Sequence, residues 1–219
     1  MPSIQIDEKL ITFLIFLPLF FISLAVHEFA HAFFAFKLGD DTAKREGRLT
    51  LNPLKHIDIV GSLVMPVLAF ASGFAIIGWA KPVPVDRRKF RNPLMDDAKV
   101  SAAGPFSNLL LSFLFFLVMA LLFMIGKSTP IPSLVFNVIW FAVYLNLFLF
   151  AFNLLPIPPL DGSHILFDFF PNKLTAKYLN LGIYGSFILI LFIYSPLWSY
   201  FSKFINLLMR FYINLFGLG

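Results

Sequence analysis

Long apolar segments, separated by short polar ones, run along most of this chain. The first occupies residues 10–38, and two more occupy residues 101–125 and 134–155. About 20 predominantly apolar residues are enough for a helix to cross the hydrocarbon core of a bilayer. The pattern therefore predicts three membrane-spanning helices, of which the second starts with Ser101 as its N-cap and has Pro105 in its first turn.

Two other apolar segments are less regular. Residues 181–215 contain Pro196 near their middle, which predicts a bent pair of C-terminal helices. Residues 59–79 are interrupted by helix-breaking residues, namely Gly61, Pro66, Gly73 and Gly78. The remaining polar stretches, including an Asp-Gly loop at 156–180, are too short to form a soluble domain. We therefore expect a single integral membrane domain over residues 1–219.

The composition favours a membrane protein over a soluble one. Hydrophobic residues make up 59% of the chain and charged residues only 13%, whereas a soluble domain is about one quarter charged. No basic stretch and no small-residue cleavage site mark the first apolar segment, so we expect it to stay as a helix rather than be removed as a signal peptide. The net charge of +5 comes from short basic loops that meet anionic lipid, so we expect no nucleic-acid partner.

The distribution of Lys and Arg predicts the orientation of the chain. The loop at 37–58 holds five of them and the loop at 81–99 holds six, whereas the loop at 126–133 holds only Lys127. Basic loops stay in the cytoplasm, so both basic loops are expected on that side of a cell membrane that the chain crosses several times. Residues 59–79 then cannot cross once, and we expect them to be re-entrant or to lie in the interface.

The first helix carries the sequence H-E-F-A-H, with His27, Glu28 and His31 in an otherwise apolar stretch. Histidines four positions apart share one helix face, where both can bind one zinc ion, and the glutamate beside them can hold a water. A charge at this depth costs about 2.5–3.5 kcal/mol, so ionisable groups there are usually functional. The alternative is a pair of buried histidines that bond to neighbouring helices.

A catalytic zinc site needs a third protein ligand, and the chain has no cysteine to supply it. Asp161 is the best candidate because no Lys or Arg lies near it in sequence, although an ordinary Asp-Gly turn is the alternative. His31 lies about 9 Å along the helix from Lys37, its expected cytoplasmic end. Two crossings, by 101–125 and 134–155, return the chain to that side just before Asp161. The predicted topology therefore places all three ligands at a similar depth.

Several motifs together resemble the site-2 protease family of intramembrane zinc metalloproteases. They occur in the order and spacing typical of that family, within residues 20–170, and the chain is similar to its compact bacterial branch, which lacks PDZ and CBS domains. The motifs are H-E-F-A-H at 27–31, G-R-L-T-L-N-P-L-K-H-I-D at 47–58, G-W-A-K-P-V-P-V at 78–85, A-A-G-P-F-S-N at 102–108 and N-L-L-P-I-P-P-L-D-G at 153–162.

The resemblance implies a role for each polar residue of these motifs. His27, His31 and Asp161 would bind one zinc ion per chain, and Glu28 would act as general base. Asn153 would be a polar partner near the scissile carbonyl, with capping of helix 134–155 as the alternative. The resemblance also implies a membrane-embedded β-hairpin at 78–85, for which an inert interfacial loop is the alternative.

The other two histidines are not ligands in the family. We interpret His164 as loop structure or as a residue behind the ligands, and His56 as a surface or turn residue. Asn108 is expected to bond across the interface between helix 101–125 and the first helix.

The expected architecture is an all-α polytopic membrane protein. Three helices carry the zinc site, with C-terminal helices and a short re-entrant or β-hairpin element added. The expected activity is hydrolysis of peptide bonds within or near membrane-spanning segments, by a site that faces the cytoplasm. Its partners would be a membrane-spanning protein or peptide and the lipid bilayer, with homo-oligomerisation left open. A zinc transporter that uses the same site is one alternative. An inactive scaffold that binds membrane clients is another, although such a scaffold would have lost a ligand or Glu28.

Overall fold

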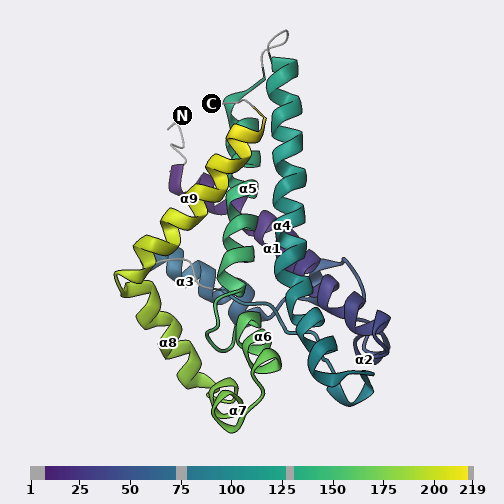
Figure 1. Cartoon of the computed structure of the whole chain (residues 1–219). Coiled ribbons are helices and arrows are strands. Elements are labelled where there is room, and N and C mark those ends of the chain that lie inside the picture. Colours follow the sequence, from purple (N-terminus) through teal and green to yellow (C-terminus); the bar gives the residue numbers. More distant parts are fainter. Residues whose placement is uncertain (1–7, 73–77, 127–130, 217–219) are drawn as a thin grey trace.

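Three helices form the centre of the molecule in the computed structural model, which describes residues 8–72, 78–126 and 131–216. Within these ranges, α1 (Glu8–Lys37), α4 (Pro93–Gly126) and α5 (Ser133–Asn153) are long and apolar enough to span a membrane. α4 packs against both α1 and α5. Figure 1 shows α4 and α5 standing nearly parallel, while α1 crosses them obliquely. The protein is therefore an all-α polytopic membrane protein, as the apolar pattern predicts.

Apolar side chains cover both the inside and the outside of this helical centre. Phe116 of α4 and Leu147 of α5 are fully buried between the helices. Leu110, Leu114 and Leu121, on the other side of α4, are about half exposed. A helix that is apolar all round suits a lipid environment, in which the exposed side contacts acyl chains instead of water.

α4 begins earlier than the sequence analysis expects. Its first residue is Pro93, so Ser101 lies inside the helix and is not its N-cap, and Pro105 lies well beyond the first turn. Asn92 provides the real start signal, because its side chain accepts a hydrogen bond from the Met95 N–H at 3.4 Å, and its own N–H donates to Asp96 at 3.0 Å. An Asn at the N-cap followed by Pro is a common way to begin a helix.

Residues 59–72 form a short helix, and the residues that follow it from 78 onward lie beside its first turn. The helix consists of η2 (Ile59–Val64) and α3 (Met65–Ser72). At 1.5 Å per residue it is about 20 Å long, too short to cross about 30 Å of hydrocarbon. After the gap at 73–77, the Trp79 N–H donates to the Gly61 carbonyl at 3.1 Å. The two ends of the segment therefore lie close together, which favours the predicted re-entrant path.

The return segment is extended but pairs with no strand. The Lys81 N–H donates to the His56 carbonyl at 2.9 Å, and the Val83 N–H donates to a side chain of α1. These bonds lead to a turn residue and to the side chain of Glu28, and the described residues contain no strand, so the β-hairpin that the family resemblance implies is not found among them. Residues 73–77, which include the Gly73 of the predicted breakers, lie outside the described ranges, as does Lys127.

The C-terminal part continues as four shorter helices. They are α6 (Asp161–Phe169), α7 (Lys173–Leu179), α8 (Ile183–Tyr194) and α9 (Leu197–Leu215). The predicted bend occurs at Pro196, between α8 and α9. α9 is amphipathic and buries Phe201, Ile205, Met209 and Tyr212 against α4 and α5. Figure 1 shows α8 and α9 as a bent pair beside the central helices.

An ionic cluster joins α6 to the rest of the fold. Arg87, in the short turn η3 (Arg87–Lys89), forms ion pairs with Asp97 of α4 and, at 3.4 Å, with Asp168 of α6. Burial and the neighbouring Asp97 carboxylate raise the pKa of Asp168 to about 7. One guanidinium therefore holds two carboxylates together, and it links three separate segments at the end of α6 that is remote from Asp161.

The re-entrant path can be tested by site-directed labelling, because the natural chain has no cysteine. Leu54→Cys and Met95→Cys place exposed thiols on either side of the 59–79 segment without removing a basic residue. Both should react with a membrane-impermeant maleimide from the same side of oriented vesicles. Ser133→Cys, at the opposite end of α5, should react only from the other side. Labelling of Leu54→Cys and Met95→Cys from opposite sides would show that the segment crosses the membrane.

The raised pKa of Asp168 predicts a pH-dependent stability. A carboxyl group whose folded pKa lies above its ordinary value of 3.8 favours folding while it is protonated, and this contribution is lost as the pH rises through about 7. The thermal unfolding midpoint in detergent should therefore fall between about pH 4 and 7 and level off above that range. Asp168→Asn should flatten this fall, and Glu46→Gln, at an exposed site, should not. An Asp168→Asn profile that matches the wild-type profile would contradict the assignment.

Candidate metal centre

His27 and His31 lie one turn apart on α1 and point in the same direction. Both side chains are buried, and their Nε2 atoms are 3.0 Å apart. This arrangement follows from the four-residue spacing, which stacks side chains on one helix face. Because both rings present the same nitrogen to one point, they form two sides of a candidate metal site.

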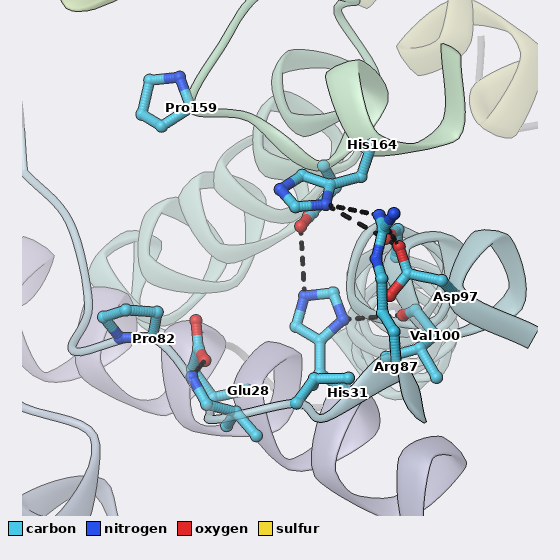
Figure 2. A pocket seen from close by; sticks show the side chains of 12 residues that line it. Glu28, His31, Pro82, Arg87, Asp97, Val100, Pro159 and His164 are labelled. Atoms are coloured by element: carbon cyan, nitrogen blue, oxygen red, sulfur yellow. Dashed lines mark hydrogen bonds and ion pairs between the residues drawn. The ribbon is translucent and has the colours of Figure 1, made fainter. Parts of the chain in front are cut away.

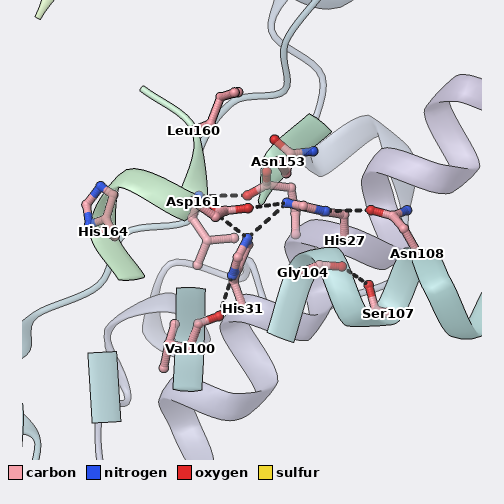
Figure 3. Close-up of polar contacts among 12 residues, drawn as sticks. His27, His31, Val100, Gly104, Ser107, Asn108, Asn153, Leu160, Asp161 and His164 are labelled. Carbon is pink, nitrogen blue, oxygen red and sulfur yellow. Dashed lines mark hydrogen bonds and ion pairs between the residues drawn. The ribbon is translucent and has the colours of Figure 1, made fainter. Parts of the chain in front are cut away.

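Asp161 completes the group from a distant part of the chain. It is the first residue of α6, and its carboxylate oxygens lie 3.1 Å from His27 Nε2 and 3.4 Å from His31 Nε2. Figure 3 shows the carboxylate facing both imidazoles across the junction of α1 and α6. The described residues therefore bring together the three predicted ligands, with one ligand atom from each within 4.8 Å of the others.

Two glycines allow this close approach. A side chain at Gly104 of α4 would collide with both imidazoles, since its Cβ would lie 2.6 Å from His27 Nε2 and closer still to His31. A side chain at Gly162 would collide with the carbonyl groups of Leu154 and Leu155, which directly follow α5. The glycine after Asp161 therefore lets α6 begin directly against the end of α5, which brings the carboxylate to the histidines.

The outer nitrogens of the two imidazoles determine their tautomers. His27 Nδ1 is 2.6 Å from Asn108 Oδ1, and His31 Nδ1 is 2.7 Å from the Val100 carbonyl oxygen. Both oxygens can only accept, so each Nδ1 must carry the hydrogen and donate it. The lone pair of each Nε2 is then directed at the other ring and at Asp161. Asn108 thus bonds across the helix interface, as the sequence analysis expects.

These three residues fit a zinc ion. Two neutral imidazoles with their lone pairs 3.0 Å apart repel each other unless a cation or a proton lies between them. The Asp161 Oδ2 atom is buried and forms no hydrogen bond. Tetrahedral zinc with bonds of 2.0–2.2 Å separates its ligand atoms by about 3.3 Å. The observed separations of 3.0, 3.1 and 3.4 Å are close to that value.

Glu28 faces a pocket beside the three ligands. It is buried, and its Oε2 atom accepts a hydrogen bond of 3.0 Å from the Val83 N–H of the return segment. His31, Asp161, Arg87 and His164 are among the residues that line the same pocket, which Figure 2 shows. One carboxylate oxygen of Glu28 is thus held in place, while the other is left for a ligand or a water.

The remaining predicted residues lie outside the ligand group. Asn153 is the last residue of α5, and its side chain donates to the Leu149 carbonyl at 3.0 Å. His164 lies at the pocket edge, with Nδ1 3.2 Å from Arg87 Nη2. His56 occupies the turn after η1 (Pro53–Lys55) but is buried rather than on the surface. Its Nε2 forms a hydrogen bond with the Thr50 carbonyl at 2.8 Å.

Sequence reasoning missed three residues around the site. Arg87 and Asp97 line the pocket and pair with each other, and Val83 contributes only a backbone N–H to Glu28. A backbone donor leaves no signal in the residue type. The ionic pair joins two segments whose proximity depends on the fold, and other charged residues surround both in the sequence, so no local pattern distinguished them.

Comparisons with known proteins agree with this geometry. A family model described as peptidase family M50 matches residues 15–193. A Bacillus subtilis protein named "Putative zinc metalloprotease YwhC" is 44% identical over 185 residues, which cover 82% of this chain and 80% of that protein. The "Putative zinc metalloprotease Rip2" of Mycolicibacterium smegmatis is 36% identical over 145 residues, or 64% of this chain and 51% of that protein. No solved structure matches the chain significantly.

The family match spans most of the chain and contains both histidines, the glutamate between them and Asp161. The relative from Bacillus subtilis is similar over a comparable length. The chain therefore belongs to peptidase family M50, the site-2 protease family, and is a membrane-embedded metallopeptidase.

Proposed function

We propose that the protein is an intramembrane zinc endopeptidase that hydrolyses peptide bonds within or near the membrane-spanning segments of other proteins. His27, His31 and Asp161 would bind one zinc ion per chain. The observation that carries the proposal is the meeting of these three ligand atoms beside Glu28, with both histidines and Glu28 on a helix long and apolar enough to span a membrane. A site for a soluble substrate would not need to be built into such a helix.

The position of the site along α1 supports a substrate in the membrane and access from the cytoplasm. α1 ends at Lys37, so His31 lies about 9 Å below that end. Residues of both basic loops lie near the same end of the helix, since Lys44 lies over the Phe36 ring and Lys89 pairs with Asp41. By the distribution of positive charge, this end would face the cytoplasm of the cell membrane. A shallow polar channel would then be enough to bring water to the site.

Zinc, when bound, would supply Lewis-acid activation of water and of a peptide carbonyl. The chain's own residues account for the proton transfers. The free carboxylate oxygen of Glu28 takes a proton from the attacking water as the water oxygen forms a bond to the carbonyl carbon. Glu28 then gives that proton to the amide nitrogen as the C–N bond breaks. The Val83 N–H keeps the carboxylate oriented through these steps.

Asn153 completes the proposed machinery. Its amide nitrogen carries two hydrogens, of which one donates to the Leu149 carbonyl. The second would be the one that donates to the carbonyl oxygen of a substrate bound at the metal centre. A hydrogen bond to an oxygen that gains negative charge during the reaction would favour hydrolysis.

Replacement of Glu28 separates catalysis from metal binding. Glu28→Gln should retain the zinc content of the wild-type protein, because the three ligands are unchanged, and should lower peptide hydrolysis by about 10²–10⁴-fold through loss of the base. Proteomics of membranes from cells that express each form would identify fragments that accumulate with the wild-type protein and vanish with Glu28→Gln. Metal analysis of the purified proteins would measure the zinc.

Glu46→Gln is the matched control, because Glu46 is exposed and distant from the pocket. It should produce the wild-type fragments at wild-type abundance. Equal fragment patterns from Glu28→Gln and the wild type would contradict the proposed mechanism. Zinc flux in proteoliposomes together with such a result would identify a transport site instead.

A further inference from the structure

A chain of polar side chains runs behind His27 through the apolar interior. Ser23 of α1, Asn108 of α4 and Asn146 of α5 are each no more than 1% exposed. Polar groups buried at this depth are costly unless every donor and acceptor is paired. The bonds of these three side chains lead in one direction, from Asn146 of α5 toward the candidate metal centre.

Asn146, the first of the three side chains, fixes the donor and acceptor directions of these hydrogen bonds. Asn146 donates one amide hydrogen to the Ala142 carbonyl of its own helix at 2.9 Å and the other to Ser23 Oγ at 3.0 Å. The Ser23 hydroxyl donates its own hydrogen to the Leu19 carbonyl at 2.8 Å, so it can accept from Asn146. Both hydrogens of Asn146 are therefore used, and its side-chain oxygen faces Asn108 as an acceptor.

The hydrogen bonds of Asn108 determine which of its side-chain atoms faces the metal ligand His27. Its amide group donates to Asn146 Oδ1 at 3.0 Å and to the Ser23 carbonyl at 3.2 Å. Because both hydrogens are used, Asn108 turns its oxygen toward His27, whose Nδ1 lies 2.6 Å away. That oxygen can only accept, so the hydrogen of the imidazole must be on Nδ1 and the lone pair on Nε2.

We propose that Asn146 is a positioning residue that acts through Asn108 to hold His27 in the Nδ1–H tautomer, which leaves Nε2 open to the metal. Without Asn146, Asn108 loses an acceptor for one of its hydrogens. The rotation of its amide that presents N–H instead of oxygen to His27 then becomes less costly. The His27 imidazole would then shift to the Nε2–H tautomer, whose hydrogen blocks metal binding at Nε2. The proposal rests on the zinc site of the proposed function.

Two measurements test this role in the purified full-length protein. Ring-nitrogen shifts of ¹⁵N-labelled histidine in detergent report the tautomer without metal, and the signals of His27 are assigned by their loss in His27→Gln. The wild type should show the Nδ1–H form, and Asn146→Leu should show a mixture. Competition with a chelator should show that Asn146→Leu binds zinc about 10–100-fold more weakly, as is typical when a partner behind a ligand is lost.

Ser112→Ala is the matched control. Ser112 is also fully buried between α4 and α5, where its hydroxyl donates to the Val143 carbonyl at 3.1 Å. It forms no hydrogen bond with Ser23, Asn108 or Asn146 among those described. This variant should keep the wild-type tautomer and zinc affinity. If Asn146→Leu does not fold, Ser23→Ala removes only the hydroxyl that accepts from Asn146, and it should shift the tautomer in the same direction by a smaller amount.

The possible failures are distinct. A folded Asn146→Leu protein with the wild-type tautomer, or with no greater loss of zinc affinity than Ser112→Ala, would overturn the role of Asn146. A wild-type protein that binds no zinc would overturn the proposed function instead. The tautomer comparison would still decide whether Asn146 controls His27.

Discussion

The contact among His27, His31 and Asp161 joins the first long helix to a short helix that follows the third. The three ligand atoms meet beside a pocket that charged and polar side chains line, and the two neutral imidazoles that face each other there repel. A bound cation removes this repulsion. The need to hold the three ligand atoms this close explains why the neighbouring residues restrict the conformations of these side chains.

Several parts of the fold help to hold His27, His31 and Asp161 together. Gly104 allows α4 to approach the imidazoles, and Gly162 allows α6 to start against the end of α5. The carbonyl of Val100 and the side chain of Asn108 orient the two rings from behind. Arg87 holds the far end of α6. The metal centre therefore takes its ligands from α1 and α6, while α4, the end of α5 and the turn with Arg87 hold those two helices in place.

Much of this arrangement was predictable from the sequence. The three long apolar segments indicated the helices that are long enough to span a membrane. The re-entrant path of residues 59–79, inferred from the distribution of Lys and Arg, stays a prediction. The H-E-x-x-H motif and the isolated Asp161 indicated the three residues that the structure brings together. Charged groups are rare in membrane helices, so the few that occur stand out.

Other features depended on contacts that sequence spacing does not reveal. The start of α4 was wrong because an apolar pattern cannot show where a helix begins within a polar loop, although Asn92 and Pro93 carried that signal. The predicted hairpin was not found in the described residues, since the hydrogen bonds of Trp79 and Lys81 lead to Gly61 and His56 rather than to a strand. His56 was expected at the surface or in a turn, and it lies in a turn but is buried there.

The most direct test of the account is X-ray absorption at the zinc edge of the purified protein. Two imidazole ligands and low-atomic-number neighbours at about 2.0–2.1 Å are expected, and the imidazole signal should be lost when both histidines of α1 are replaced. A zinc environment with a different number of imidazoles, or one that survives replacement of His27 and His31, would contradict the claim that these residues form the metal centre.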